Sequence, residues 1–392
     1  MRHSQARWSL LAMLLIAWIQ VWSAGRPVDA AQYRYAEDAH GKPARVTESW
    51  DIEGTEWQGV GTITGVVRCG DEVFLSDSQS RVRRYDVKRR KPLDDIGVAD
   101  DEGRLSRPTA LAADCAAQAL YVVDTGLRAV LAYRLPSGRF HKKYPLPKTF
   151  TYGGPADLAD SRVLYVGGMW FPVEQSSQWS FGTLDLNHYF DPLRFGVKLS
   201  LESGDVTPGF HGYDDKCVSA ASCLKVSLAR IRDGGSIDWV IAHGGSEHLG
   251  LYAGDGKHVA SIDIRSPLFH RTGIALGHNT PARPYTLWRR ENSEIDRVFA
   301  FGKIIATSHM VVDVAPDWDF GTPINYRVHL NLHSLDGTGL VSDISLPDRP
   351  VGRDESHLYV VDYGPGGRRP ESKSVRLLQI PIKAGKDSFQ HN

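Results

Sequence analysis

The chain has 392 residues, of which 42% are hydrophobic and 10% aromatic, and it carries 46 basic and 46 acidic side chains. This composition is sufficient for a large apolar core and excludes a disordered chain. The balanced charge provides no basic surface of the kind that attracts nucleic acid, so nucleic acid is excluded as a partner.

The first 30 residues have the pattern of a secretory signal peptide. A basic start, MRHSQAR, precedes the apolar run WSLLAMLLIAWIQVW, and Val28-Asp29-Ala30 is a small-residue cleavage site. The run is short for a membrane span, although an uncleaved N-terminal anchor is an open alternative. We therefore expect an exported protein, periplasmic or extracellular, with no transmembrane domain after cleavage. A flexible polar segment is expected at 31–43.

Strand-length apolar runs begin after this segment. Ala44–Ile52 alternates apolar and polar residues, as an edge strand does. The stretch Leu105–Phe140 holds three apolar runs between tight turns, at Thr109–Ala113, Ala119–Val123 and Ala129–Leu135. With Phe140–Leu146 as a fourth run, about 40 residues supply four antiparallel strands, which is the size of one propeller blade.

The same order of runs recurs twice more. Ile63–Ile96 repeats it, and so does Val351–Ile382, where LYVVD matches Leu120–Asp124 letter for letter. On these lines the chain resembles the NHL-type six-bladed β-propellers. The resemblance implies an all-β fold of six four-stranded antiparallel blades within residues 44–383. The last blade offers only three strands, so Ala44–Ile52 is expected to complete it and close the ring. A polar tail follows at 384–392.

The middle of the chain fits this scheme by strand spacing. Blade one is Gly61–Gly97 and blade two is Leu105–Leu146. In blade three we expect SRVLYVGG as the second strand, FGTLDLNHY as the third and FGVKLSLES as the fourth. Blades four and five contain hairpins that turn at Asp255-Gly256 and Asp336-Gly337.

The connections between these strands differ in length by class. In a propeller, loops between strands two and three and loops between blades open on one face, and the other loops open on the opposite face. The second class is short here. The first class contains five long loops, at Gly168–Ser180, Ser203–Ser222, Arg265–Asp296, Asp313–Asn325 and Tyr363–Lys373. Long loops on a compact scaffold are usually functional, so we expect this face to bind a ligand.

Aromatic and histidine residues of these loops are candidates for ligand contact: Trp170, Trp179, His211 and Trp318. Exposed rings stack on sugars or fill apolar pockets. The alternative is that the rings anchor the loops to the scaffold.

Three aspartates occupy the same position, the end of the second strand, in three blades: Asp77, Asp124 and Asp362. They could hold a divalent cation or act as acid and base at the channel mouth, or they could simply cap the following turns. His243 and His309 stand near the equivalent position in two other blades, so all five are weak metal candidates. No motif indicates a metal or any other cofactor.

Four cysteines follow the signal segment. Cys217 and Cys223 lie close together in a polar loop and are candidates for a local disulfide, as an exported chain permits. Cys69 and Cys115 occupy the same turn of neighbouring blades, where they could pair or remain free.

These features favour a binding module that takes a protein, glycan or small molecule on the face with the long loops. One alternative is a metal-dependent hydrolase or lyase with its site at the central channel mouth. A second is a structural subunit of an envelope-associated complex. Whether the protein is an enzyme is left open by the sequence.

Overall fold

The computed structural model describes residues 48–51, 62–98, 102–170, 194–211, 226–232, 235–244, 246–270, 289–313, 325–363 and 376–382. All of them belong to one compact unit, Tyr35–Asn392. The described chain is all-β, as predicted, apart from turns and a short helical turn at 289–291. None of its helical segments has the length and apolar character needed to cross a membrane.

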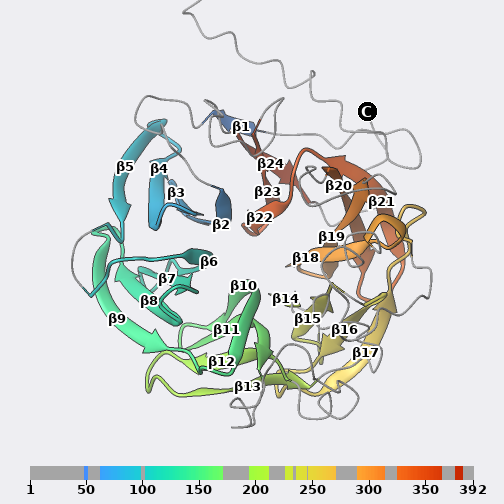
Figure 1. Ribbon diagram of the computed structural model, residues 1–392, viewed down its shortest axis with the longest axis horizontal. Helices are drawn as coiled ribbons and strands as arrows, with labels where there is room; N and C mark the ends of the chain where they lie inside the picture. The colour runs from blue at the N-terminus through green and yellow to red at the C-terminus, as the bar shows by residue number, and fades with distance from the viewer. Residues whose placement is uncertain are drawn as a thin grey trace, which may run out of the picture. The chain divides into compact units, whose positions relative to one another are not determined.

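The strands form several four-stranded antiparallel sheets, consistent with a β-propeller (Figure 1). Four of these sheets are separate, and they are made of β6 (Pro108–Asp114), β7 (Ala119–Asp124), β8 (Ala129–Arg134) and β9 (Arg139–Pro145); β10 (Phe150–Asp160), β11 (Val163–Trp170), β12 (Arg194–Ser200) and β13 (Val206–His211); β14 (Val226–Arg230), β15 (Trp239–His243), β16 (His248–Tyr252) and β17 (His258–Asp263); and β18 (Glu294–Phe301), β19 (Ile304–Asp313), β20 (Asn325–Ser334) and β21 (Gly339–Leu346).

The remaining eight strands form one sheet that consists of two antiparallel halves. One half is β2 (Ile63–Cys69), β3 (Glu72–Asp77), β4 (Arg81–Asp86) and β5 (Lys91–Ile96), and the other is β22 (Pro350–Arg353), β23 (His357–Asp362), β24 (Arg376–Pro381) and β1 (Glu48–Asp51). A single parallel pair, Val66 with Gly352, joins the halves. The strand expected at Ala44–Ile52 is present at Glu48–Asp51, and it pairs antiparallel with β24 from Glu48–Gln379 to Asp51–Arg376.

The sheet β10–β13 corrects two strand assignments. FGVKLSLES, expected as a fourth strand, supplies the third strand β12, and the fourth is Val206–His211, which the sequence analysis placed in a loop. Val206–His211 contains one proline and one glycine, which are weak strand formers, so its pattern does not stand out. It nevertheless pairs with β12 from Leu199–Val206 to Arg194–His211. FGTLDLNHY lies outside the described residues.

The apolar core lies between neighbouring sheets, because each sheet buries both faces. One cluster combines Val123 and Val130 with Leu164 and Val197 of the next sheet. Another combines Ile241 with Phe210 and Tyr165. The inner strands β2, β6, β10, β14 and β18 contact one another in that order, and β22 contacts both β2 and β18, since the guanidinium carbon of Arg353 lies 5.9 Å from the Phe301 ring centre.

Glycines allow two of these inner strands to approach. A Cβ at Gly154 would lie 1.7 Å from the Val226 carbonyl oxygen, and one at Gly352 would lie 1.9 Å from that of Val66. Both contacts are with backbone, so a larger residue would force β10 away from β14 at Gly154 and β22 away from β2 at Gly352.

A disulfide joins Cys69 to Cys115, with an S–S distance of 2.06 Å. Cys69 ends β2 and Cys115 follows β6, so the bond links the first-to-second-strand turns of two adjacent sheets. The sequence left open whether Cys69 and Cys115 pair or remain free, and in the structure they pair. Cys217 and Cys223 lie outside the described residues.

Candidate functional site

Two of the aspartates at the ends of the second strands form hydrogen bonds with neighbouring groups of the protein. The Asp77 carboxylate is fully buried, accepts a hydrogen bond from Arg83 Nε at 2.7 Å and accepts another from the Gln79 backbone N–H at 2.7 Å. The side chains of Asp77 and Arg83 are 0% and 4% exposed, so each charge compensates the other in the interior.

Asp124 is also fully buried, and it caps two turns at once. Its carboxylate accepts from the backbone N–H groups of Ser106 (2.7 Å), Arg107 (3.0 Å) and Leu127 (2.9 Å). These bonds tie the segment before β6 to the β7–β8 turn. Asp362 ends β23 opposite Arg376 and is 9% exposed. For Asp77 and Asp124, the contacts favour the capping interpretation over metal binding.

We expect Asp124→Ala to lower the free energy of unfolding by about 2 kcal/mol, because it leaves three backbone N–H groups without their acceptor. Asp124→Asn, which keeps one carbonyl oxygen, should lose about half as much. Urea unfolding measures both. Elemental analysis of the same samples supplies the control, and stoichiometric metal that disappears in Asp124→Ala with the fold intact would contradict the capping role.

Of the two histidines, His243 stands at the end of a second strand as expected, and His309 does not. His243 ends β15, is fully buried and packs its ring 5.5 Å from that of Phe195. His309 does not end its strand: β19 continues to Asp313, because Asp313 still pairs with Asn325 of β20. Within the described residues, no group of three or more His, Cys, Asp or Glu side chains could hold a metal ion.

His309 belongs instead to a polar layer inside the sheet β18–β21. It pairs directly with His329 across β19 and β20, and the rings stack with their centres 5.4 Å apart. Its Nδ1 is 2.9 Å from Asn331 Nδ2, and its Nε2 is 3.9 Å from an Asp343 oxygen. We call His309, His329, Asn331, His333 and Asp343 the histidine layer.

Burial keeps the imidazoles of this layer neutral. Desolvation, followed by the neighbouring histidines His329, His270 and His333, lowers the pKa of His309 to about 3. Desolvation and Arg265 lower the pKa of His333 to about 4, and desolvation also lowers that of His329. His309 Nε2, both nitrogens of His329 and His333 Nδ1 are buried without a hydrogen-bond partner among the described residues.

The candidate loop residues are only partly described. Trp170 ends β11, donates from Nε1 to Thr149 Oγ1 at 2.9 Å and packs against the core, which is the anchoring alternative. His211 ends β13 opposite Arg194. Trp179 and Trp318 lie outside the described residues, so their role as ligand contacts stays a prediction.

The connections nevertheless confirm the predicted difference in length. Between the described strands, connections from first to second strand and from third to fourth strand have two to five residues, for example at 70–71, 161–162 and 302–303, except for the eight residues of 231–238. The long segments all join a second strand to a third or one sheet to the next, and therefore leave from the opposite strand ends; they are 171–193, 212–225, 264–293, 314–324 and 364–375. We call this side the loop face and the other the short-turn face.

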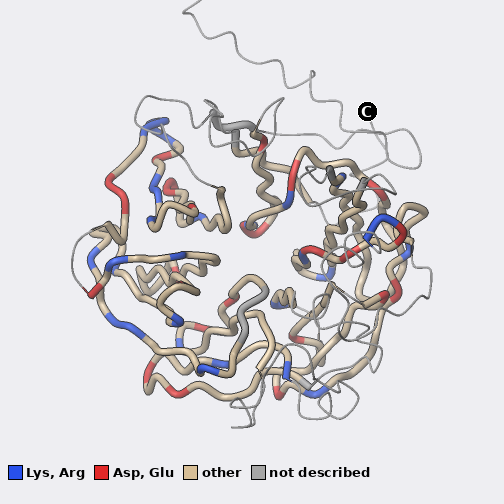
Figure 2. Tube along the Cα trace, in the orientation of Figure 1, with Lys and Arg blue, Asp and Glu red and all other residues tan. Residues whose placement is uncertain are grey.

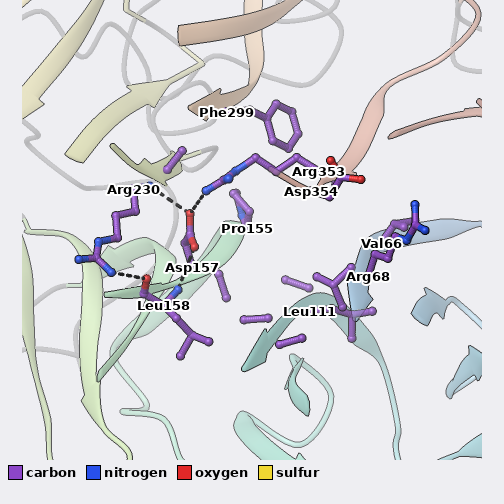
Figure 3. A pocket seen from close by; sticks show the side chains of 18 of the residues that line it. Val66, Arg68, Leu111, Pro155, Asp157, Leu158, Arg230, Phe299, Arg353 and Asp354 are labelled. Carbon is purple, nitrogen blue, oxygen red and sulfur yellow. Dashed lines mark hydrogen bonds and ion pairs between the residues drawn. The ribbon is translucent and has the colours of Figure 1, made fainter. Parts of the chain in front are cut away.

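A cavity of about 480 Å³ lies between the inner strands of the sheets (Figure 3). It is lined by parts of β2, β6, β10, β14, β18 and β22 and by residues of the adjoining short turns, such as Cys115, Ser161 and Glu355. It therefore extends toward the short-turn face. We call it the central channel.

An ion pair crosses the central channel. Arg353 of β22 donates from Nη2 to Asp157 Oδ2 of β10 at 2.9 Å, although the two residues are 196 positions apart. The same oxygen accepts the Arg230 backbone N–H at 3.0 Å. Figure 3 shows the Arg353 guanidinium reaching past Phe299 to Asp157. Three sheets are thus connected through one carboxylate.

No family model matches the sequence, and no curated protein is similar to it in sequence. Among solved structures, a member of the DUF4221 family from Bacteroides vulgatus matches with a TM-score of 0.65 and 11% identity, over 87% of this chain and 98% of that one. This chain shares its fold. The WD40 repeats of RRP9 match less closely, with a TM-score of 0.49 and 12% identity over 86% of this chain and 99% of that one.

These likenesses concern the fold alone, and the NHL-type resemblance stays a prediction. Sequence reasoning missed the Arg353–Asp157 pair and the histidine layer. The first carries no local signal, since its partners are far apart in the chain. The histidine layer does have a local signal. His309, His329 and His333 fall within β19 and β20, and the alternation of side chains along a strand places His329, Asn331 and His333 on one side of β20.

Proposed function

We propose that the protein is an exported, six-bladed β-propeller that serves as a protein-interaction module and contacts its partner through the loop face. The count of six treats the two halves of the eight-stranded sheet as separate blades, which the single parallel pair between them supports. In this scheme, the pairing of β1 with β24 completes the last blade and closes the ring.

The asymmetry of the connections is the observation that carries the proposal. Five long segments leave on one face, whereas the described turns on the other are short. A scaffold without such a function has no reason to concentrate long segments on one face. Basic and acidic residues are interspersed along the described chain (Figure 2), so a mixed protein surface suits this module better than a polyanion.

Export is supported by two features together. The first 30 residues have the signal-peptide pattern, and Cys69 and Cys115 form a disulfide between separate sheets. Disulfides persist in oxidising compartments such as the periplasm and the extracellular space and are rare in the cytosol.

Site-specific photo-cross-linking tests the choice of face. A cross-linking amino acid is placed at Trp179 or Trp318 in the long segments, and at Ser137 or Asp336 in the short turns as matched controls. Incubation with the exported protein fraction of the source cells should give one cross-linked partner from the first two positions alone. An excess of unmodified protein should compete it away.

A variant with 314–324 replaced by a short Gly-Ser linker should lose the partner while it keeps the thermal stability of the wild type. The same partner cross-linked from Ser137 or Asp336 would assign the interaction to the short-turn face. No partner from any position would overturn the proposal of an interaction module.

A further inference from the structure

We propose that the central channel binds a small organic acid with two or more carboxylates, held by the arginines of the inner strands. The inference is independent of the loop face, because the channel extends toward the opposite side. Its volume of about 480 Å³ lies within the range of small-molecule sites.

The channel lining contains five arginines, namely Arg68, Arg230, Arg232, Arg297 and Arg353. Arg68 is engaged, since its Nε donates to the Gly70 carbonyl oxygen at 2.8 Å, whereas the pairing of the other four is incomplete within the described residues. Arg353 binds Asp157, and Arg232 contacts Glu355 at 3.6 Å at the rim, where these side chains are 60% and 90% exposed. The Arg230 guanidinium makes only a 3.5 Å contact with the Leu158 carbonyl oxygen. The Arg297 guanidinium forms no hydrogen bond or ion pair with any described residue, although the backbone of Arg297 pairs with Ser308 of β19.

The lining also holds five acidic residues, and three of them are hydrogen-bonded within or beside their own turns. Asp114 accepts from the Ala117 backbone N–H at 2.9 Å, and Asp160 accepts from that of Arg162 at 2.7 Å. Asp354 accepts from the Tyr359 hydroxyl at 2.7 Å and from two backbone N–H groups of its turn. The charges of the lining are balanced in number, but none of these carboxylates is paired with the Arg230 or Arg297 guanidinium within the described residues.

The contact between Arg353 and Asp157 is an example of a carboxylate bound by an arginine of this channel. The Asp157 carboxylate binds Arg353 from across the channel, so the guanidinium already reaches a carboxylate at the centre. A planar guanidinium matches the two oxygens of a carboxylate, and a partly desolvated site strengthens that bond. A ligand with two carboxylates would engage Arg297 and Arg230 and compete with Asp157 for Arg353.

Isothermal titration calorimetry of the full chain with citrate and succinate tests the site. Both acids should bind, and neutral succinamide should not. Arg297→Gln should weaken the Kd for citrate at least tenfold with an unchanged melting temperature, because Arg297 has no described partner to lose. Asp157→Asn should tighten the Kd several-fold, since it removes the competing charge and keeps an oxygen for the Arg230 N–H.

Arg139→Gln is the matched control, since it removes the same charge from an exposed position on the outer strand β9. An equal loss in Arg139→Gln and Arg297→Gln would reduce the effect to general electrostatic attraction and overturn the site. Binding of inorganic phosphate without binding of either acid would overturn the ligand class. Absence of heat with every probe would overturn the proposal as a whole.

Discussion

A shift from pH 7 to pH 4 is expected to destabilise the protein by about 6 kcal/mol through the histidine layer. In the folded state the pKa of His309 is about 3 and that of His333 about 4, whereas unfolded histidines titrate near 6.5. Below 6.5 the unfolded chain therefore binds protons that the folded chain excludes. At about 1.4 kcal/mol per pKa unit, each of these residues contributes on the order of 3 kcal/mol at pH 4.

The sign follows from the direction of the shifts. The stabilisation is complete above pH 6.5 and is lost as the pH falls toward 4. Asp343 faces the layer from β21 and opposes this loss for His329. Three other groups lower the pKa of a histidine in the layer and so increase the loss of stability. They are Arg265 for His333, Arg327 for His329 and His270 for His309. Unfolded Asp and Glu side chains titrate near pH 4, so the histidine effect is read between pH 6.5 and 5, and carboxylate titration adds to the curve only toward pH 4.

Urea unfolding at pH 7, 6, 5 and 4 measures the effect. His333→Gln should reduce the pH dependence by about half, because an amide does not take up a proton. His141→Gln, at an exposed position of β9, should leave the curve parallel to that of the wild type. If His333→Gln is too unstable at pH 7, NMR titration of the wild-type histidines decides, and a His309 or His333 that titrates near 6.5 in the folded protein would contradict the prediction.

Loss of the Cys69–Cys115 disulfide is expected to lower the free energy of unfolding by about 4 kcal/mol. The bond spans a sequence separation of 46 residues, and a cross-link of that length removes about this much chain entropy from the unfolded state. It also holds together the turns of two adjacent sheets. The double variant Cys69→Ser/Cys115→Ser, compared with the wild type by urea unfolding, provides the measurement.

A second double variant, Cys217→Ser/Cys223→Ser, is the matched control. A bridge between these cysteines would close a much shorter loop, so its removal should cost clearly less. Thiol alkylation of the exported wild type should leave Cys69 and Cys115 unmodified. Free thiols at these positions, or an unchanged stability in the first double variant, would contradict the prediction.

The parts of the fold that could be predicted from the sequence are those set by local patterns of turn residues and apolar runs. The turns at Asp114–Gln118 and Asp124–Gly126 separate runs that pair as β6, β7 and β8, since turn chemistry and strand length act over a few residues. The pattern failed at β13, where pairing with β12 stabilises a strand of weak propensity. The position of Asp124 at the end of a second strand could be predicted from the sequence. The backbone N–H groups of Ser106, Arg107 and Leu127 that donate to it could not.

The charge pair across the central channel shows a further limit. Whether Arg353 meets Asp157 depends on how all intervening sheets pack, and no feature of either strand reports that arrangement. The disulfide was open for the same reason, since two equivalent turns are bridged only when their Cα atoms come close, here 5.4 Å.

The pairing of β1 with β24 has a consequence for the order in which the protein folds. Among the described strands, β1 comes first in the chain and β24 comes last, so Glu48–Asp51 has no partner until residues 376–381 have been synthesised. The sheet that contains both strands is completed only when β24 is available, and this pairing must close a loop of more than 300 residues, which carries a large entropic cost. A nascent chain that lacks β24 therefore leaves β1 unpaired, which would suit the export proposed above, because secretion requires a polypeptide that has not finished folding.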